Sequence, residues 1–503
     1  MHSGGVLNIL GKLLVLIALF LLAPIPVSVY YDDGMSEVFL RCAVMGAGVG
    51  ALLVLLFRPV KELSLRDGFA VATGSWLGMA LLGALPYLLS SQVPSPVDAI
   101  FESMSGFTTT GATILTDIEA LAPSLLFWRA TTQWLGGMGI IVLSLAILPL
   151  LGVGGMQLFQ AEMTGPTKDR LTPRIQDTAR ILWSVYLLLT IVLIALLMGA
   201  GLNFYDATTH AFSTISTAGF SPYNSSVGHF DSLQVELLII LFMFIGGINF
   251  TMHHHALRGK IGTYWQSQEF RLYLGVTLGA ILLITLLNLN ASVFTSTAES
   301  LRHAAFQSVS ILTSSGFGTD DFTLWPSASQ LVLVGLMLIG GMAGSTSGGI
   351  KVVRILLFFK FVRLQLRSLI HPQTVGVIKL GGHRVPQEVM TAVLGFFALY
   401  LMLFISVSLV VTAMGVDLVT GTTAVIATLN NIGPGLHLVG PSHSFAALPD
   451  GVKALLTFCM LAGRLELYTV IVLLTPAFWK TARRPELRFT PKHHANSGQG
   501  SQK

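Results

Sequence analysis

A short glycine loop recurs four times along this sequence, each time directly after a short apolar run that is rich in Ser and Thr. The four loops are Thr109-Thr110-Gly111-Ala112, Thr217-Ala218-Gly219-Phe220, Ser314-Ser315-Gly316-Phe317 and Asn431-Ile432-Gly433-Pro434. Four copies of one unit predict a four-fold arrangement of the chain around a central axis. Glycine loops that meet at such an axis can turn backbone carbonyls inward, which is how a cation selectivity filter is built.

The composition places these units in a membrane. The sequence is 53% hydrophobic and 11% charged, whereas soluble domains carry roughly a quarter charged residues. Apolar runs of membrane-spanning length predict spans over residues 7–30, 36–57, 68–92, 124–150, 180–202, 232–255, 270–291, 328–350, 388–415 and 452–478. Shorter apolar runs end at the loop glycines, over residues 96–108, 205–216, 300–313 and 418–429. We interpret these as half-helices that enter the membrane and return, with their ends buried by protein.

Each unit therefore consists of a span, a half-helix, a filter loop and a second span. The predicted fold is an all-α membrane protein with four such pseudo-repeats around a central pore and two extra N-terminal transmembrane helices. The boundaries are residues 1–66 for the extra helices, 67–165, 166–262, 263–375 and 376–485 for pore repeats 1 to 4, and 486–503 for a disordered cytoplasmic tail. Asp98 and Asp206 lie at the same position before their glycines, where a carboxylate at a helix N-terminus is favourable.

Basic residues gather in alternate breaks between the spans, among them Lys351, Arg363 and Arg367, whereas the opposite breaks carry acidic residues such as Asp117 and Asp320. This positive-inside pattern predicts a multi-pass protein with cytoplasmic N- and C-termini and with glycine loops that face outward. The net charge of +5 follows from this topology. We therefore expect membrane lipid around the chain and no nucleic-acid partner.

A second glycine element follows each loop, as Gly136-Gly137, Gly246-Gly247, Gly340-Gly341 and Gly463. The third is the longest, and its candidate gating residues are Gly340, Gly341, Gly344, Ser345, Thr346, Ser347, Gly348 and Gly349. So much Gly and Ser cannot hold a helix, so the span must break there. We interpret the segment as a flexible intramembrane loop beneath the filter that acts as a gate. The alternative is a small-residue face at which helices pack closely.

Arg464 belongs to the fourth element and lies deep in an apolar span, where an unpaired cation is costly. On the permeation path, its charge would limit ion flux. The alternative is a buried ion pair with another repeat. Glu466 lies two residues further on, so it points away from Arg464 on a helix and is not an obvious partner.

The loops offer oxygen ligands and little else. Glycine permits the backbone angles and the close approach that a ladder of carbonyls requires. The flanking Thr and Ser residues add hydroxyl oxygens, and none of the four loops contains a carboxylate. This donor set favours a monovalent cation over a divalent one.

Five motifs together resemble one known family. They are Phe107-Thr108-Thr109-Thr110-Gly111-Ala112-Thr113, the run from His210 to Phe220, the run from Gly341 to Lys351, Leu429-Asn430-Asn431-Ile432-Gly433-Pro434-Gly435 and Gly463-Arg464-Leu465-Glu466. Nearly the whole chain resembles the Trk/Ktr/HKT potassium transporter superfamily, most closely its bacterial TrkH/TrkG branch. Two small departures are the Ala218-Gly219 pair, where a second glycine would also fit, and the three consecutive histidines His253 to His255.

The resemblance implies potassium uptake across the bacterial inner membrane, with potassium held at the sixteen residues of the four loops. It implies gating by loop 340–349 and Arg464. It also implies a homodimer in which each protomer has its own pore, and a cytosolic TrkA-like partner with nucleotide-binding RCK domains. No organic cofactor is expected on this chain, because the nucleotide belongs to the partner.

Three alternative functions fit part of the same pattern. A sodium-conducting relative of the same superfamily often has serine at the first filter glycine, whereas this chain has Gly111. A cation-coupled secondary transporter with inverted repeats predicts two-fold rather than four-fold internal similarity. A metal-dependent membrane enzyme would need His253, His254 and His255 as ligands, but consecutive histidines on a helix point in different directions, and we find no nucleophile–base pattern. We therefore expect no enzymatic activity; coupling to protons or sodium stays open.

Overall fold

The computed structural model describes residues 2–60, 64–147, 175–373 and 376–480. The tail expected over residues 486–503 and the end of the span expected over residues 124–150 lie outside this part of the chain. The described residues are mostly helical, with one small antiparallel hairpin formed by β1 (Lys379–Leu380) and β2 (His383–Arg384). The hairpin is a local addition to the predicted all-α fold.

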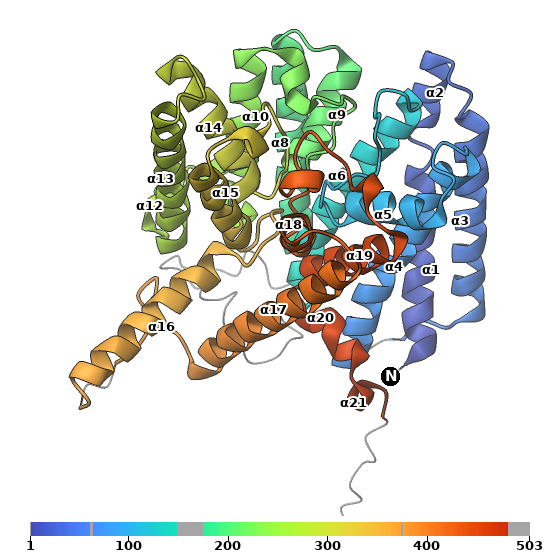
Figure 1. Ribbon diagram of the computed structural model, residues 1–503. Coiled ribbons are helices and arrows are strands. Elements are labelled where there is room, and N and C mark those ends of the chain that lie inside the picture. Colours follow the sequence, from blue (N-terminus) through green and yellow to red (C-terminus); the bar gives the residue numbers. More distant parts are fainter. Residues whose placement is uncertain (1, 61–63, 148–174, 374–375, 481–503) are drawn as a thin grey trace, which may run out of the picture.

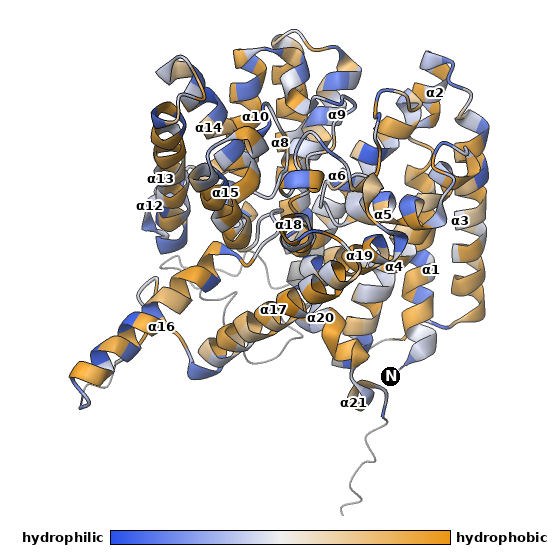
Figure 2. Cartoon of the chain, in the orientation of Figure 1, coloured by the Kyte–Doolittle hydropathy of each residue, from blue (hydrophilic) through white to orange (hydrophobic). Residues whose placement is uncertain are grey.

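Long helices form most of the molecule (Figure 1). They are α1 (Ser3–Phe20), α3 (Ser36–Leu56), α4 (Leu65–Leu89), α6 (Pro123–Ile147), α8 (Ile175–Gly199), α13 (Gln268–Asn290) and α17 (Gln387–Ala413). The short helix α2 (Ile25–Tyr31) follows α1 and belongs to the same candidate span. Within the described residues, six helical segments are long and apolar enough to cross a membrane, and two bent pairs raise this to eight. Figure 2 shows apolar colouring along the outer helices α3, α13 and α17, as expected for surfaces that contact lipid.

Four short helices match the expected half-helices: α5 (Pro96–Phe107), α9 (Phe204–Ile215), α14 (Thr297–Leu312) and α18 (Leu418–Leu429). Each begins at a polar N-cap whose side chain accepts a backbone N–H from the first turn, and the caps are Ser95, Asn203, Ser296 and Asp417. This capping satisfies one of the free N–H groups at each start. Asp98 and Asp206 lie in these first turns, as predicted.

The packing of the half-helices closes a ring. Each half-helix packs between the two long helices of its own repeat and also against the second helix of the preceding repeat. Thus α5 contacts α4, α6 and α19 (Asp450–Arg464), α9 contacts α8, α6 and α10 (Leu233–Gly246), α14 contacts α13, α10 and α15 (Ser327–Ile339), and α18 contacts α17, α15 and α19. Because α5 of repeat 1 packs against α19 of repeat 4, the four repeats form a closed circle in chain order.

Two spans that hydropathy predicts as continuous are bent, so those predictions were wrong. The span expected over 232–255 consists of α10 and α11 (Phe250–Leu257), which meet at 104°. A Cβ on Gly247 would lie 2.4 Å from the hydroxyl of Tyr273, so α13 packs directly against this bend. The side chain of Asn249 then caps the new helix by accepting from the N–H of Thr251.

The span expected over 452–478 consists of α19, α20 (Tyr468–Ile471) and η5 (Val472–Leu474), with a bend of 114°. Glu466 has φ 59° and Leu467 has φ 55°, so both lie in the left-handed region. The N–H of Leu467 donates to the carbonyl of Ala462 at 2.8 Å, and the N–H of Glu466 donates to that of Gly463 at 3.2 Å. This is a Schellman ending, which terminates α19 without a glycine at the left-handed position.

The span of repeat 3 breaks where the glycine run predicts it. Helix α15 ends at Ile339, a non-helical segment follows, and α16 (Val352–Ile370) then projects away from the other helices, at the lower left of Figure 1. Gly340 has φ 76° and ψ −171°, a conformation that is essentially restricted to glycine. The remaining short elements are α12 (Thr263–Gln266), α21 (Pro476–Trp479), η1 (Ser226–Phe230), η2 (Phe322–Leu324), η3 (His437–Val439) and η4 (Phe445–Ala447).

Candidate ion pathway

All four half-helices end with the same backbone turn. The residue two positions before each loop glycine has a left-handed φ, between 51° and 57°, at Thr109, Thr217, Ser314 and Asn431. The following N–H bonds back to a carbonyl near the end of the half-helix, from Thr110 to Ser105, Ala218 to Ser213, Ser315 to Ser310 and Ile432 to Ala427, at 2.8–2.9 Å. This Schellman arrangement reverses the chain and satisfies helix-end carbonyls. Four sequences that differ in side chains thus share one backbone geometry.

The four loop glycines pack against one another in a ring. We number the glycine loops 1 to 4 in chain order. A Cβ on Gly111 of loop 1 would lie 2.2 Å from the carbonyl oxygen of Ala218 in loop 2. The same contact joins Gly219 to Ser315 at 2.0 Å, Gly316 to Ile432 at 2.0 Å and Gly433 to Thr110 at 2.9 Å. All four glycines also have φ between 77° and 104°. Glycine is therefore required both by the backbone angle and by the neighbouring carbonyl.

Two of the residues that directly follow the glycines direct their carbonyls away from the ring. The carbonyl of Ala112 accepts a hydrogen bond from the Ser105 hydroxyl at 2.6 Å, and the carbonyl of Phe317 accepts one from Ser310 at 2.7 Å. These two carbonyls are directed back to their own half-helices. Above the ring lies a cavity whose lining includes all four glycines. The candidate oxygen ring is thus formed by residues at and before the glycines.

The segment after α15, residues 340–351, packs against three of the glycine loops. It contacts the residues that precede the loop glycines, and we call this side of the ring the inner side. The Thr346 hydroxyl is 3.2 Å from that of Thr217, and the Ser347 hydroxyl is 3.1 Å from that of Ser314. The N–H of Gly349 donates to the carbonyl of Asn430 at 3.0 Å. We name residues 340–351 the intramembrane loop. It contacts loops 2, 3 and 4 through the residues at or next to their left-handed turns.

Loop 1 has different contacts on this inner side. Its left-handed residue is Thr109, whose fully buried hydroxyl has no hydrogen-bond partner among the described residues. The neighbouring Thr110 hydroxyl accepts a hydrogen bond from the Asn431 side chain at 2.9 Å, which joins loops 4 and 1. The intramembrane loop therefore covers the ring unevenly.

Arg464 approaches the intramembrane loop from repeat 4. Its guanidinium donates to the carbonyl of Thr346 at 2.8 Å and to that of Gly136 at 3.4 Å, and the residue is 3% exposed. Within the described residues no acidic side chain pairs with Arg464, so the geometry favours contact with the loop over a structural ion pair. Glu466 is not its partner, as expected, but the reason differs from the prediction, because Glu466 lies in the bend after α19 and not on the helix.

Several charged residues near the end of the intramembrane loop that leads into α16 were not predicted as part of the site. Glu466 pairs with Arg354, in the first turn of α16, at 2.6 Å. The Lys351 ammonium donates to the carbonyl of Ser347, and the Glu269 carboxylate accepts the N–H of Ala343 at 2.8 Å. The Glu269 contact ties the loop to α13, the Lys351 contact lies within the loop, and the Arg354–Glu466 pair ties α16 to the bend after α19. The positively charged run near Lys351 is visible in the sequence, but its acidic partners lie far away along the chain.

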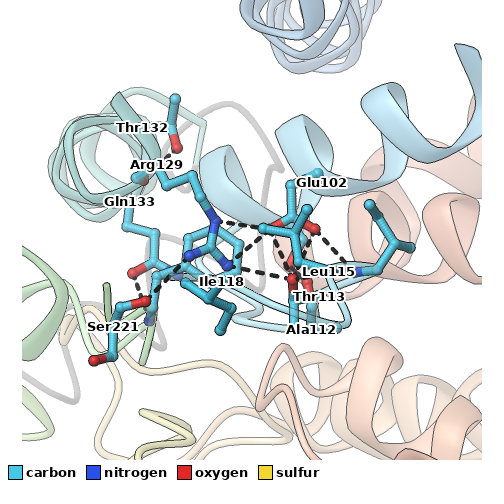
Figure 3. A network of polar contacts seen from close by, with 12 residues as sticks. Glu102, Ala112, Thr113, Leu115, Ile118, Arg129, Thr132, Gln133 and Ser221 are labelled. Atoms are coloured by element: carbon cyan, nitrogen blue, oxygen red, sulfur yellow. Dashed lines mark hydrogen bonds and ion pairs between the residues drawn. The ribbon is translucent and has the colours of Figure 1, made fainter. Parts of the chain in front are cut away.

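A buried ion pair lies behind loops 1 and 2 and was also missed (Figure 3). Arg129 on α6 and Glu102 on α5 are 2.8 Å apart, and both residues are almost completely buried. One turn further along α6, Gln133 donates to the carbonyl of Ala218 at 2.8 Å and accepts the N–H of Phe220 at 3.0 Å. The signal available in the sequence was one basic residue and one acidic residue inside otherwise apolar segments.

The three consecutive histidines do not form a metal site. His253 is buried, and its two ring nitrogens lie 2.8 Å from the Tyr264 hydroxyl and 3.0 Å from the Ile245 carbonyl. It therefore joins the two sides of the α10–α11 bend. Over residues 2–60, 64–147, 175–373 and 376–480, no group of three or more His, Cys, Asp or Glu side chains is placed to hold a metal ion.

Comparison with known proteins places this geometry in a family. Residues 35–481 match the family TrkH, described as a cation transport protein. The Trk system potassium uptake protein TrkH of Halomonas elongata is 44% identical over 94% of this chain and 99% of its own length. The Trk system potassium uptake protein TrkG of Escherichia coli K12 is 36% identical over 95% of this chain and 99% of its own length.

A solved structure has the same fold. The crystal structure of the potassium transporter TrkH from Vibrio parahaemolyticus superposes with a TM-score of 0.88 at 40% sequence identity. The match covers 95% of this chain and all of that chain. These relatives are named as transport proteins and not as enzymes.

Proposed function

The chain belongs to the TrkH family of cation transport proteins, and we propose that it takes up potassium selectively across a bacterial inner membrane. In this proposal the four glycine loops hold the ion, and the carbonyl and hydroxyl oxygens of the residues at and before each glycine replace its hydration shell. The relatives named above as potassium uptake proteins support the choice of ion.

The ring of glycines is the observation that carries this proposal. Each glycine packs against the carbonyl of the next loop, from Gly111 to Ala218 and onward until Gly433 returns to Thr110. A closed ring of uncharged oxygen donors suits a monovalent cation, because the loops add no negative side chain. The half-helices direct their C-terminal ends, which carry partial negative charge, toward the same ring.

We further propose that the intramembrane loop and Arg464 form the gate. The loop contacts three of the four glycine loops from the inner side, and Arg464 bonds to its Thr346 carbonyl. A segment that blocks the ring must move before ions pass. Its glycines, among them Gly340 and Gly344 with positive φ, supply the backbone freedom for that movement.

The proposal includes the assembly that the family resemblance implies. The chain forms a homodimer, and a cytosolic TrkA-like subunit with RCK domains regulates it. The N-terminus, the C-terminus and the basic helix α16 then face the cytoplasm. Helix α16 directly continues the intramembrane loop and projects from the bundle (Figure 1), so a partner that binds α16 can pull on the loop.

A sodium-conducting or cation-coupled transporter of the same superfamily is the alternative. Glycine at all four ring positions favours potassium over sodium, because no serine Cβ or hydroxyl distorts the ring at Gly111. Uptake of potassium, rubidium, sodium and lithium by the purified protein in lipid vesicles tests both. We expect potassium and rubidium to enter well and sodium and lithium poorly. Equal uptake of all four ions would contradict the proposal, and a strict dependence on an imposed proton or sodium gradient would favour the coupled alternative.

A further inference from the structure

We propose that the buried pair Arg129–Glu102 is a positioning brace that fixes loops 1 and 2 of the ring and thereby sets ion selectivity. We name Arg129, Glu102, Thr113 and Ser221 the filter brace. The inference rests on the proposed function, because it assigns these residues a part in selective cation passage. None of them contributes to the ring itself.

The guanidinium of Arg129 reaches two repeats at once. Its Nε donates to Glu102 at 2.8 Å, and one terminal nitrogen is 3.3 Å from the Thr113 hydroxyl, two residues after Gly111. The other terminal nitrogen donates to the carbonyl of Ser221, two residues after Gly219, at 3.2 Å. Figure 3 shows the side chain between the two loops. A single rigid fork therefore fixes the distance between corresponding points of loops 1 and 2.

Glu102 holds loop 1 from the other side. Its carboxylate accepts the Thr113 hydroxyl at 3.0 Å and the N–H of Ile114 at 3.0 Å. The guanidinium of Arg129 also lies 3.9 Å from the centre of the Phe220 ring, which follows Gly219 directly. Each group of the pair is thus used in contacts with the segments that leave the ring, and these segments have little freedom to shift.

The pseudo-repeats show that this brace is specific to one corner. The positions that correspond to Glu102 are His210 on α9, Gln307 on α14 and Ala424 on α18. His210 contacts the Ser221 hydroxyl at 3.1 Å, which repeats the Glu102–Thr113 contact without a charge. In contrast, the positions on α10, α15 and α19 that correspond to Arg129 are the apolar Ile239, Leu333 and Leu456. Only the corner between loops 1 and 2 has an ionic link among these equivalent positions.

Energetics favour a positional role for the pair. A buried ion pair is costly to desolvate, and apolar side chains of similar volume often give equal or greater stability. Unlike apolar side chains, the ion pair fixes directions, because the Arg guanidinium and the carboxylate each bond several partners at defined angles. Small displacements of the ring carbonyls change their fit to potassium relative to sodium, so the brace is expected to act on the ratio of the two rates.

The test compares rubidium and sodium uptake by purified full-length variants in lipid vesicles. Glu102→Gln removes the charge and leaves Arg129 unpaired. Arg129→Lys keeps the charge but cannot contact both loops. We expect each variant to raise the ratio of sodium to rubidium uptake roughly fivefold, which corresponds to about 1 kcal/mol. The control is Glu236→Gln, because the buried Glu236 forms a bidentate pair with the partly exposed Arg302, at 2.6 and 2.8 Å, away from the glycine loops.

The outcomes separate the brace from an ordinary structural pair. A wild-type ratio in folded Glu102→Gln, a wild-type ratio in Arg129→Lys, or an equal change in Glu236→Gln would each overturn the proposal. Should Glu102→Gln fail to fold, Thr113→Val decides, because it removes only the shared hydroxyl and should shift the ratio in the same direction. If the wild-type protein itself shows no preference for rubidium, the proposed function fails and the brace fails with it; a wild-type preference with unchanged variants refutes the brace alone.

Discussion

At Gly111 any side chain would meet a neighbouring carbonyl. A Cβ there would lie 2.2 Å from the Ala218 oxygen, and the φ of 78° is unfavourable for other residues. We therefore predict that Gly111→Ser increases sodium uptake relative to rubidium, because the added atoms displace one quarter of the ring. Gly34→Ser is the control, since Gly34 has φ 71° and open space around it. Unchanged selectivity in Gly111→Ser would show that Gly111 does not contribute to the filter.

Arg464 is a second single residue whose charge and hydrogen bonds are expected to affect ion uptake. At an effective dielectric constant near 20, a unit charge about 8 Å from the ion changes its energy by about 2 kcal/mol. This alters a rate by roughly thirtyfold before screening by water reduces the effect. We predict that Arg464→Ala speeds uptake and leaves selectivity nearly intact. Arg464→Lys should lie closer to wild type, although lysine loses the fork that bonds the Thr346 and Gly136 carbonyls. Initial uptake rates measure both effects, and a folded Arg464→Ala protein that is no faster would assign Arg464 a structural role.

At the scale of elements, the Arg354–Glu466 pair joins the first turn of α16 to the bend after α19. Because α16 directly follows the intramembrane loop, this link restrains the movement proposed for gating. We predict that Arg354→Gln combined with Glu466→Gln increases uptake several-fold in the absence of a partner. The double variant avoids leaving one charge unpaired, which is the costly change in a partly buried pair. Arg363→Gln, further along α16, is the control. Wild-type uptake in the double variant would place the restraint elsewhere.

The sequence predicts best those elements whose pattern lies within a few neighbouring residues. The half-helices are short apolar runs with polar caps such as Ser95 and Asn203, and the break after Ile339 follows from the density of glycine. The bends at Gly247 and Leu467 were not predicted, because hydropathy records how apolar a segment is and not its direction. Glu466 and Leu467 adopt left-handed φ without any glycine to indicate it.

The contacts between elements were the least predictable part of the site. Arg129 and Ser221, or Arg464 and Thr346, are distant along the chain and meet only because the repeats close into a ring. The loop glycines could be identified because their pattern recurs four times. A residue such as Gln133, which bonds to the Ala218 carbonyl from the neighbouring repeat, has no counterpart with the same chemistry at Met243 or Met460.

The whole molecule contains a complete ring within one chain. Helix α5 of repeat 1 packs against α19 of repeat 4, and Gly433 returns to Thr110, so no second copy is needed to close the circle. We therefore predict that each protomer of a homodimer conducts independently. Dimers made of one wild-type protomer and one protomer with a blocked pore should take up rubidium at about half the wild-type rate, with wild-type selectivity. The two protomers can carry different affinity tags so that only mixed dimers are purified and reconstituted. Complete loss of uptake in mixed dimers, or sodium and rubidium fluxes that differ from the average of the two parents when the second protomer carries Gly111→Ser, would show that the two pores are coupled. Fluxes that instead add as two separate conductances would follow directly from the closure of four loops within a single chain.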